Sequence, residues 1–326
     1  MSFHLSAGAA WAILATLLAS ISFVGCGDRA TTSSKVPAPF ALPDDAPRLA
    51  DELPIEYPGL KNVVAYDRAV FSGSLPDGDA GFDSLRRLGV RTIISVDGAL
   101  PNLEPARARG MRYVHLPIGY DRVPAERTLE LARAIRDLPQ PIYFHCHHGK
   151  HRSAAAAGAA LVTLGSCSPE SAVSRMRVSG TSASYRGLYA SVSTASVVSS
   201  ARISAVDGSF PEVTPPIGLV RAMSELERID EHVSAIQKAG WKVPEDHPDL
   251  VPAAEAGRMA DIYRNLLADT RTLSQASGFV ELMHSAHAAA QALEDALIAG
   301  ESPTELTRHY ESMKSDCRAC HTQFRD

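Results

Sequence analysis

The segment from His145 to Ser153, which reads HCHHGKHRS, constrains the fold of this chain more than any other. It follows a β-rich run at 141–144 and precedes an alanine-rich stretch at 154–164 that is typical of a helix. A short loop between a strand and a helix brings backbone N–H groups together, and the helix N-terminus adds positive potential there. The segment therefore predicts an anion-binding loop at the C-terminal end of a strand in an α/β sheet.

This loop carries both a nucleophile and a cation. The positive potential and the nearby guanidinium of Arg152 favour the thiolate form of Cys146, which is the reactive form of a cysteine. An arginine can bind two phosphate oxygens at once, which a lysine does less well. The pattern therefore predicts a thiolate held beside a phosphate-binding arginine.

The order His-Cys, five residues, Arg-Ser resembles the signature of the protein tyrosine phosphatase superfamily, and the core from Gly149 to Arg152 is most similar to its compact dual-specificity and atypical members. The resemblance implies that Cys146 forms a phosphocysteine, that Arg152 binds the phosphoryl group and that Ser153 helps the thiolate to leave. The implied activity is hydrolysis of phosphate monoesters. The implied phosphate cradle consists of His147, His148, Gly149, Lys150, His151 and Arg152.

The reaction also needs an acid that protonates the leaving oxygen. Members of the superfamily supply an aspartate from a loop upstream of the cysteine, and Asp121 lies between a predicted strand and a predicted helix. Asp97 is the second candidate and Glu126 the third. Lys150 and the loop histidines predict a strongly cationic cradle, so inositol phosphates stand beside phosphotyrosine and other phosphoproteins as expected substrates.

Two other interpretations of this loop stay open. Cys146 would be a structural cysteine if it is only buried at the end of a strand. The loop histidines would instead form a metal site, because histidine-rich tracts bind metals. The histidines in question are His145, His147, His148 and His151.

A second motif lies at the other end of the chain, where Cys317 to His321 reads CRACH, the c-type haem attachment pattern. Ser302 and Pro303 are typical of a helix start, and apolar residues then recur at spacings of three and four. Cys317 and Cys320 are therefore expected on the buried face of one helix, with His321 beside them as axial ligand. A zinc or redox half-site is the alternative, but one pair supplies too few ligands for closed zinc coordination.

Three further amphipathic stretches, at 219–236, 259–266 and 279–297, precede this helix with short connections and predict a four-helix bundle. With its CxxCH ending, the region 215–326 resembles the cytochrome c′ family. The resemblance implies a covalent haem c, His321 as proximal ligand and Met223 as a candidate sixth ligand. It also implies a redox partner or a gas ligand, and a homodimer.

The N-terminus predicts export. Residues 7–24 are mostly small and apolar, and the sequence FVGC that ends at Cys26 resembles the bacterial lipoprotein box. We expect a signal peptide at 1–25, a lipid on Cys26 that anchors the chain to a membrane, and a tether at 26–53. A simple secretory signal or an uncleaved anchor stays open. Attachment of haem outside the bacterial cytoplasm, which the family resemblance implies, agrees with a periplasmic location.

The rest of the chain predicts two domains. Residues 54–198 alternate between strand and helix patterns, which predicts an α/β domain whose parallel-type sheet carries helices on both faces. The resemblance described above implies that this is a dual-specificity-phosphatase-like domain. Residues 199–214 contain Gly and Pro and are expected to link this domain to the bundle at 215–326. The net charge is −5 and the sequence contains no block of basic residues, so the charge pattern does not indicate nucleic-acid binding.

Two functions therefore stay open at the level of the sequence. The first is an exported cysteine-dependent phosphatase with a haem domain that regulates it. The second is an electron-transfer or gas-binding cytochrome whose phosphate-binding loop is not catalytic.

Overall fold

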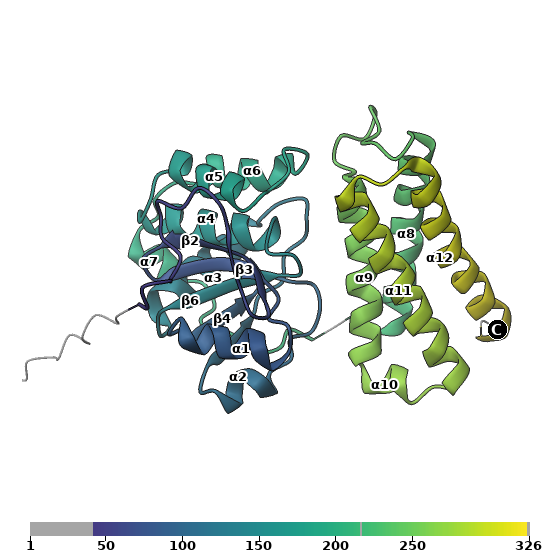
Figure 1. Cartoon of the computed structure of the whole chain (residues 1–326), viewed down its shortest axis with the longest axis horizontal. Coiled ribbons are helices and arrows are strands. Elements are labelled where there is room, and N and C mark those ends of the chain that lie inside the picture. The colour runs from purple at the N-terminus through teal and green to yellow at the C-terminus, as the bar shows by residue number, and fades with distance from the viewer. Residues whose placement is uncertain (1–41, 216, 325–326) are drawn as a thin grey trace, which may run out of the picture. The chain divides into compact units, whose positions relative to one another are not determined.

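The computed structural model describes residues 42–215 and 217–324 (Figure 1). The first part contains a six-stranded sheet with the order β1-β2-β3-β6-β4-β5. Strands β3, β6, β4 and β5 run parallel, while β1 and β2 are antiparallel. This confirms the predicted sheet of mostly parallel strands. The strands are β1 (Ile55–Tyr57), β2 (Leu60–Asp67), β3 (Val70–Ser74), β4 (Thr92–Ser95), β5 (Arg112–His115) and β6 (Ile142–Cys146).

Helices cover both faces of this sheet, as predicted. Side chains alternate along a strand, so Ile142 and Phe144 of β6 belong to the core on one face, and Tyr143 belongs to the core on the other. The Tyr143 face is covered by α1 (Gly78–Arg87) and α2 (Glu104–Ala108). The opposite face is covered by α3 (Ala125–Asp137), α4 (Arg152–Leu164), α5 (Pro169–Val178), α6 (Arg186–Ser193) and α7 (Ser200–Ser204).

The second part of the chain consists of packed helices, here called the helical region, and this agrees with the predicted bundle. Its helices are α8 (Leu219–Lys238), α9 (Pro252–Ala268), α10 (Thr270–Leu273), α11 (Ser277–Ala299) and α12 (Pro303–Phe324). Gly300 ends α11 with a φ of 71°, a conformation that glycine adopts without strain. The Ser302 hydroxyl accepts a hydrogen bond from Glu305 N at 3.3 Å, as the predicted cap of α12 requires.

The segment that was expected to link the two parts belongs partly to the first. It contains α7, and its side chains Ile203 and Phe210 are buried in the core of the sheet. The backbone amide of His115 in β5 donates to Pro211 O at 2.8 Å, and Thr214 N donates to His115 Nδ1 at 3.1 Å. The chain therefore stays bound to the sheet edge as far as Thr214. The elements that were not predicted are β1, β2, α2, α6, α7 and α10.

The predicted signal peptide at 1–25, the lipidation site Cys26 and the first part of the tether lie outside the described residues. All described residues belong to one compact unit. Across 42–215 and 217–324, every helix is too short or too polar to pass through a lipid bilayer.

Candidate active site

The candidate nucleophile Cys146 is the last residue of β6, and its side chain is buried. Ser153, in the first turn of α4, places its hydroxyl oxygen 3.4 Å from the Cys146 sulfur. Ser72 Oγ donates to Ser153 Oγ at 3.0 Å, so the hydrogen of the Ser153 hydroxyl is free to point at the sulfur. A hydroxyl in this position stabilises a thiolate.

The loop between β6 and α4 presents its amides rather than its carbonyl oxygens to an anion. Among the described residues, the backbone N–H groups of 147–151 donate to no protein acceptor. The carbonyl oxygens are instead bound on the outer side of the loop, which turns the peptide dipoles inward. The bonds run from Leu75 N to His147 O (3.1 Å), from Asn62 Nδ2 to Gly149 O (2.9 Å) and from Thr181 Oγ1 to Lys150 O.

Gly149 makes this loop shape possible. Its φ of 73° lies in the left-handed region, and a Cβ at this position would lie 2.2 Å from the carbonyl carbon of Gly73. No other residue fits here without moving β3, because backbone atoms cannot swing aside as a flexible side chain can.

Arg152 opens α4 and is 1 % exposed. Its Nη1 donates to Asp261 Oδ2 of α9 at 2.7 Å, and its Nη2 donates to the Tyr120 hydroxyl at 2.6 Å. Asp97 Oδ1 lies 3.5 Å from Nη2. The Nε group is buried and has no partner among the described residues, so it keeps a donor for a phosphate oxygen.

The pKa values of the two aspartates beside Arg152 are shifted in opposite directions. Burial alone would raise the pKa of Asp97, but the charges of Arg152 and Arg264 outweigh it, and the pKa is lowered. Burial raises the pKa of Asp261 to about 7, against the effect of Arg152. Asp97 is therefore a fixed anion that orients Arg152, while Asp261 is a weaker acid than a solvated aspartate.

Asp121 is not brought to the cradle in this structure. Its side chain is 63 % exposed and accepts a hydrogen bond from Arg122 Nε at 2.9 Å. The neighbouring Tyr120 occupies the space over Arg152, with 4.0 Å between the guanidinium carbon and the ring centre. Asp97 is the sequence candidate that does lie beside Arg152, and Glu126 is exposed in the first turn of α3.

The histidines around Cys146 contribute less positive charge than expected. Burial lowers the pKa of His147 to about 4 and that of His151 to about 3, so both rings are neutral at neutral pH. His151 stacks on Tyr185, with 4.1 Å between ring centres. The Nε2 of His145 lies 2.6 Å from the Tyr113 hydroxyl, inside the sheet. The prediction that His147 and His151 add positive charge to the cradle is therefore wrong.

The helical region lies directly against the cradle. Asp261 pairs with Arg152, Arg264 donates to His147 Nδ1 at 3.3 Å, and Asn265 Nδ2 donates to Gly98 O at 2.6 Å. A cavity of about 320 Å³ beside Arg152 is lined by residues of both parts. The contact of Asp261 with Arg152 was not predicted from the sequence, because a charged residue on a helix normally lies on a solvated face. The available signal was that Asp261 lies between Met259 and Ile262 in the sequence, which belong to the predicted apolar stripe of this helix.

The CxxCH motif lies on the last turns of α12. Cys317 and Cys320 are free thiols, Cys320 is buried and Cys317 is half-buried, and the Tyr263 hydroxyl lies 3.6 Å from Cys317 Sγ. Burial raises the pKa of both thiols. His321 is exposed, and Met223 is half-buried on α8 against the core of the bundle. Two thiols one turn apart, followed by an accessible imidazole, form a donor set that fits covalent haem attachment.

No protein-family model matches this chain, and curated protein sequences give no match either. Among solved structures, the chain is similar to TpbA from P. aeruginosa, with 24% identity and a TM-score of 0.34 over 40% of this chain and 83% of that one. It is similar to a putative phosphatase from Shewanella putrefaciens, with 18% identity and a TM-score of 0.35 over 43% and 96% of the two chains. It is also similar to the catalytic domain of the PP-IP phosphatase SIW14 from S. cerevisiae, with 18% identity and a TM-score of 0.37 over 44% and 87%.

Proposed function

We propose that this protein hydrolyses phosphate monoesters through a covalent phosphocysteine at Cys146. The observation that carries the proposal is the arrangement around one sulfur atom. A serine hydroxyl lies 3.4 Å from that sulfur, unbonded amides line the loop that follows it, and Arg152 opens the next helix with an unpartnered Nε. A buried cysteine with a purely structural role requires none of these groups.

The proposed reaction has two steps. In the first, the Cys146 thiolate attacks phosphorus, the bond to the leaving oxygen breaks with its electron pair, and an acid protonates that oxygen. In the second, water attacks phosphorus, a base takes its proton, and the sulfur leaves with the S–P electron pair. Ser153 stabilises the sulfur as it leaves, while Arg152 and the loop amides hold the phosphoryl oxygens in both steps.

A Ser153→Ala substitution tests this sequence of steps. We expect the second step to slow by about 100-fold, because the departing thiolate loses a positioned donor. The first step is then faster than the second, so the leaving group should appear in an initial burst. Rapid denaturation followed by mass spectrometry should also detect a phosphorylated Cys146 peptide. Ser72→Ala, which removes only the orienting bond, should slow the reaction less. Turnover without any phosphorylated cysteine in either protein would overturn the proposal.

We retain Asp121 as the candidate acid, although its loop must move before the carboxyl group reaches the cradle. Asp121→Asn should reduce the rate about 100-fold with alkyl phosphates and much less with activated aryl phosphates, whose leaving oxygens need no proton. Glu126→Gln is the matched control, because this carboxylate is also exposed near the same loop and should not matter. An equal loss on both classes of substrate would contradict the acid role.

The substrate is a phosphorylated protein or a small phosphate monoester. Lys150 adds a cation to the loop, which favours inositol phosphates, but the neutral His147 and His151 bring the site closer to the charge that phosphotyrosine requires. Phosphate release from phosphotyrosine peptides, phosphoserine peptides and inositol phosphates, compared at equal concentration, distinguishes these classes.

The helical region is proposed to hold a covalent haem c through Cys317 and Cys320, with His321 as axial ligand and Met223 as candidate sixth ligand. The group would supply a redox-active iron that meets an electron-transfer partner or a gas ligand. The helical region contacts Arg152 through Asp261 of α9. We therefore propose that the haem state regulates the phosphatase site through a shift of α9 that alters this contact.

Haem attachment is tested by expression in a bacterium that attaches haem to exported proteins. The chain should gain the mass of one haem and give a c-type pyridine haemochrome spectrum. Replacement of Cys317 and Cys320 by Ala should abolish both signals, whereas Cys167→Ser should retain them. A wild-type chain without haem would remove this proposal and, with it, the alternative that the protein is chiefly a cytochrome.

This function is consistent with an exported protein. We propose a lipoprotein anchored through Cys26 on the periplasmic side of a bacterial membrane, where haem attachment takes place. The bundle is also proposed to form a homodimer.

A further inference from the structure

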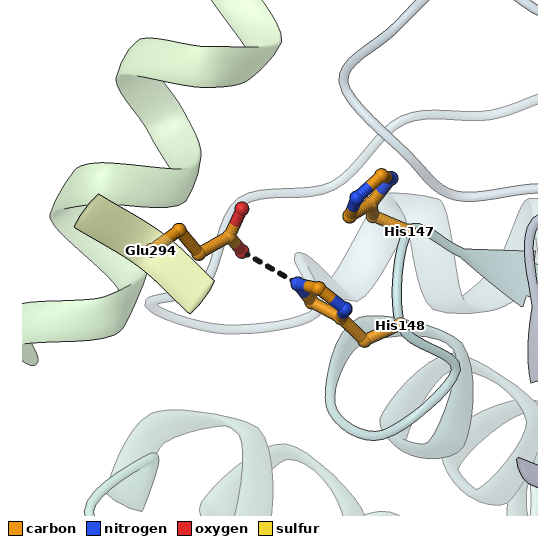
Figure 2. Close-up of side chains that lie close together, drawn as sticks. All are labelled: His147, His148 and Glu294. Atoms are coloured by element: carbon orange, nitrogen blue, oxygen red, sulfur yellow. Dashed lines mark ion pairs between the residues drawn. The ribbon is translucent and has the colours of Figure 1, made fainter. Parts of the chain in front are cut away.

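Two loop histidines and one glutamate of the helical region lie together beside the cradle. Figure 2 shows His147 and His148 next to Glu294 of α11, whose side chain points toward them. One ligand atom from each of the three residues lies within 4.8 Å of the other two. Imidazole nitrogen and carboxylate oxygen are ligands that zinc binds readily in proteins.

The separation between His148 and Glu294 is compatible with two ligands of one metal ion. His148 Nε2 lies 3.2 Å from Glu294 Oε1, yet this buried nitrogen has no hydrogen-bond partner among the described residues. Two ligands bound to one tetrahedral zinc at about 2.0–2.1 Å are separated by about 3.3 Å. The observed separation therefore matches an edge of such a site.

The surroundings of this cluster favour a cation. Glu294 is buried, its Oε2 accepts a hydrogen bond from Gln291 Nε2 at 2.9 Å, and its Oε1 faces His148. A positive partner stabilises a buried carboxylate. Asp295 Oδ1 lies 4.0 Å from His148 Nε2 and is placed to add a further oxygen. Arg264 donates to His147 Nδ1 at 3.3 Å, and this long contact must break when a metal binds, because a neutral imidazole has a single lone pair. Arg264 keeps its bond to Asp261 Oδ1 at 3.0 Å.

We propose that His147, His148 and Glu294 form a binding site for a divalent cation of the zinc type, with Asp295 or water as the fourth ligand. The two histidines belong to the phosphate loop and Glu294 belongs to α11, so the bound ion would fix the helical region against the cradle. It would therefore inhibit phosphate release. This inhibitory effect rests on the proposed function, whereas the binding itself does not.

The test is a zinc titration of the full chain in competition with a chromophoric chelator. All proteins carry Cys317→Ala and Cys320→Ala, which removes the two thiols of the CxxCH motif as competing zinc ligands. We expect one tight ion per chain, and Glu294→Gln should weaken it at least about 10-fold. Glu294→His, which still supplies a ligand atom for the metal, should retain zinc binding. His309→Ala is the matched control, since it disrupts a separate cluster that His309 forms with Glu301 and Glu305.

Cobalt provides a second readout, because four-coordinate cobalt with nitrogen and oxygen ligands has a characteristic visible spectrum. Zinc binding that is unchanged in Glu294→Gln, or lost in His309→Ala, would overturn the site, as would sulfur-to-cobalt charge-transfer bands. If Glu294→Gln fails to fold, the titration of His148→Ala decides, since weakened binding is expected and unchanged binding would overturn the site. A chain that releases no phosphate refutes the proposed function, yet the titration still decides the metal site.

Discussion

Replacement of Cys146 by Ser should reduce phosphate release by about 10,000-fold, because a serine hydroxyl in this loop is not ionised and cannot act as the nucleophile. The substitution is nearly isosteric, and the Ser153 hydroxyl 3.4 Å away can bond to either atom, so the fold should persist. Phosphate binding should survive as well, since the loop amides and Arg152 are untouched. The measurement is phosphate release at saturating substrate, with phosphate affinity determined by calorimetry.

Cys167→Ser is the matched control for this experiment. Cys167 is also a free cysteine in the first part of the chain, but burial raises the pKa of its thiol to about 11, and it lies outside the loop. Its replacement should leave turnover within about two-fold of the wild type. Equal activity of Cys146→Ser and the wild type would refute the thiolate mechanism and favour a loop that only binds phosphate.

An Asp261→Asn substitution should raise kcat/KM by about 10-fold, mostly through a lower KM. Asp261 now accepts a hydrogen bond from Arg152 Nη1, and its negative charge repels a phosphate dianion, so binding of substrate through two donors of Arg152 requires that α9 is first displaced. Loss of this carboxylate charge leaves Asp97 as the remaining buried anion beside Arg152, and it weakens the contact between α9 and Arg152 by more than the 1.4 kcal/mol that corresponds to a tenfold change. Steady-state kinetics with a small aryl phosphate provide the measurement.

Glu255→Gln controls for damage to the same helix. Glu255 is a buried carboxylate of α9 that pairs with His232 at 2.7 Å and with Arg258 at 3.0 Å, and none of these bonds reaches the cradle. Its kcat/KM should stay close to that of the wild type. A lower rate in Asp261→Asn, strongest with poor leaving groups, would contradict competition for Arg152 and would identify Asp261 as the proton donor instead.

The local architecture of the site was predictable from the sequence because it depends on neighbours along the chain. The run from β6 through the loop to α4 needs only a buried strand, a glycine with positive φ and a helix start, and each has its own residue signal. The bundle helices were equally visible from their apolar stripes. Strand β2 was missed because residues 60–67 are buried on both faces, which removes the alternation that marks a strand.

The electrostatics of the site were not predictable, since they depend on contacts between distant segments. Nothing near His147 in the sequence indicates that Arg264 and Glu294 will surround it and that burial will keep its ring neutral. In the same way, Tyr120 and Asp121 are adjacent in the chain, but only packing decides that Tyr120 faces Arg152 and Asp121 faces solvent.

The hydrogen bonds of His115 bear on where the part of the chain that contains the sheet ends. A fragment that stops at Val198 would lack Ile203 and Phe210, and would leave an apolar surface on the sheet open to water. It would also remove Thr214 from His115, whose Nε2 lies 3.0 Å from Asp97 O beside Arg152. We therefore expect the smallest soluble fragment with an intact cradle to extend to Thr214.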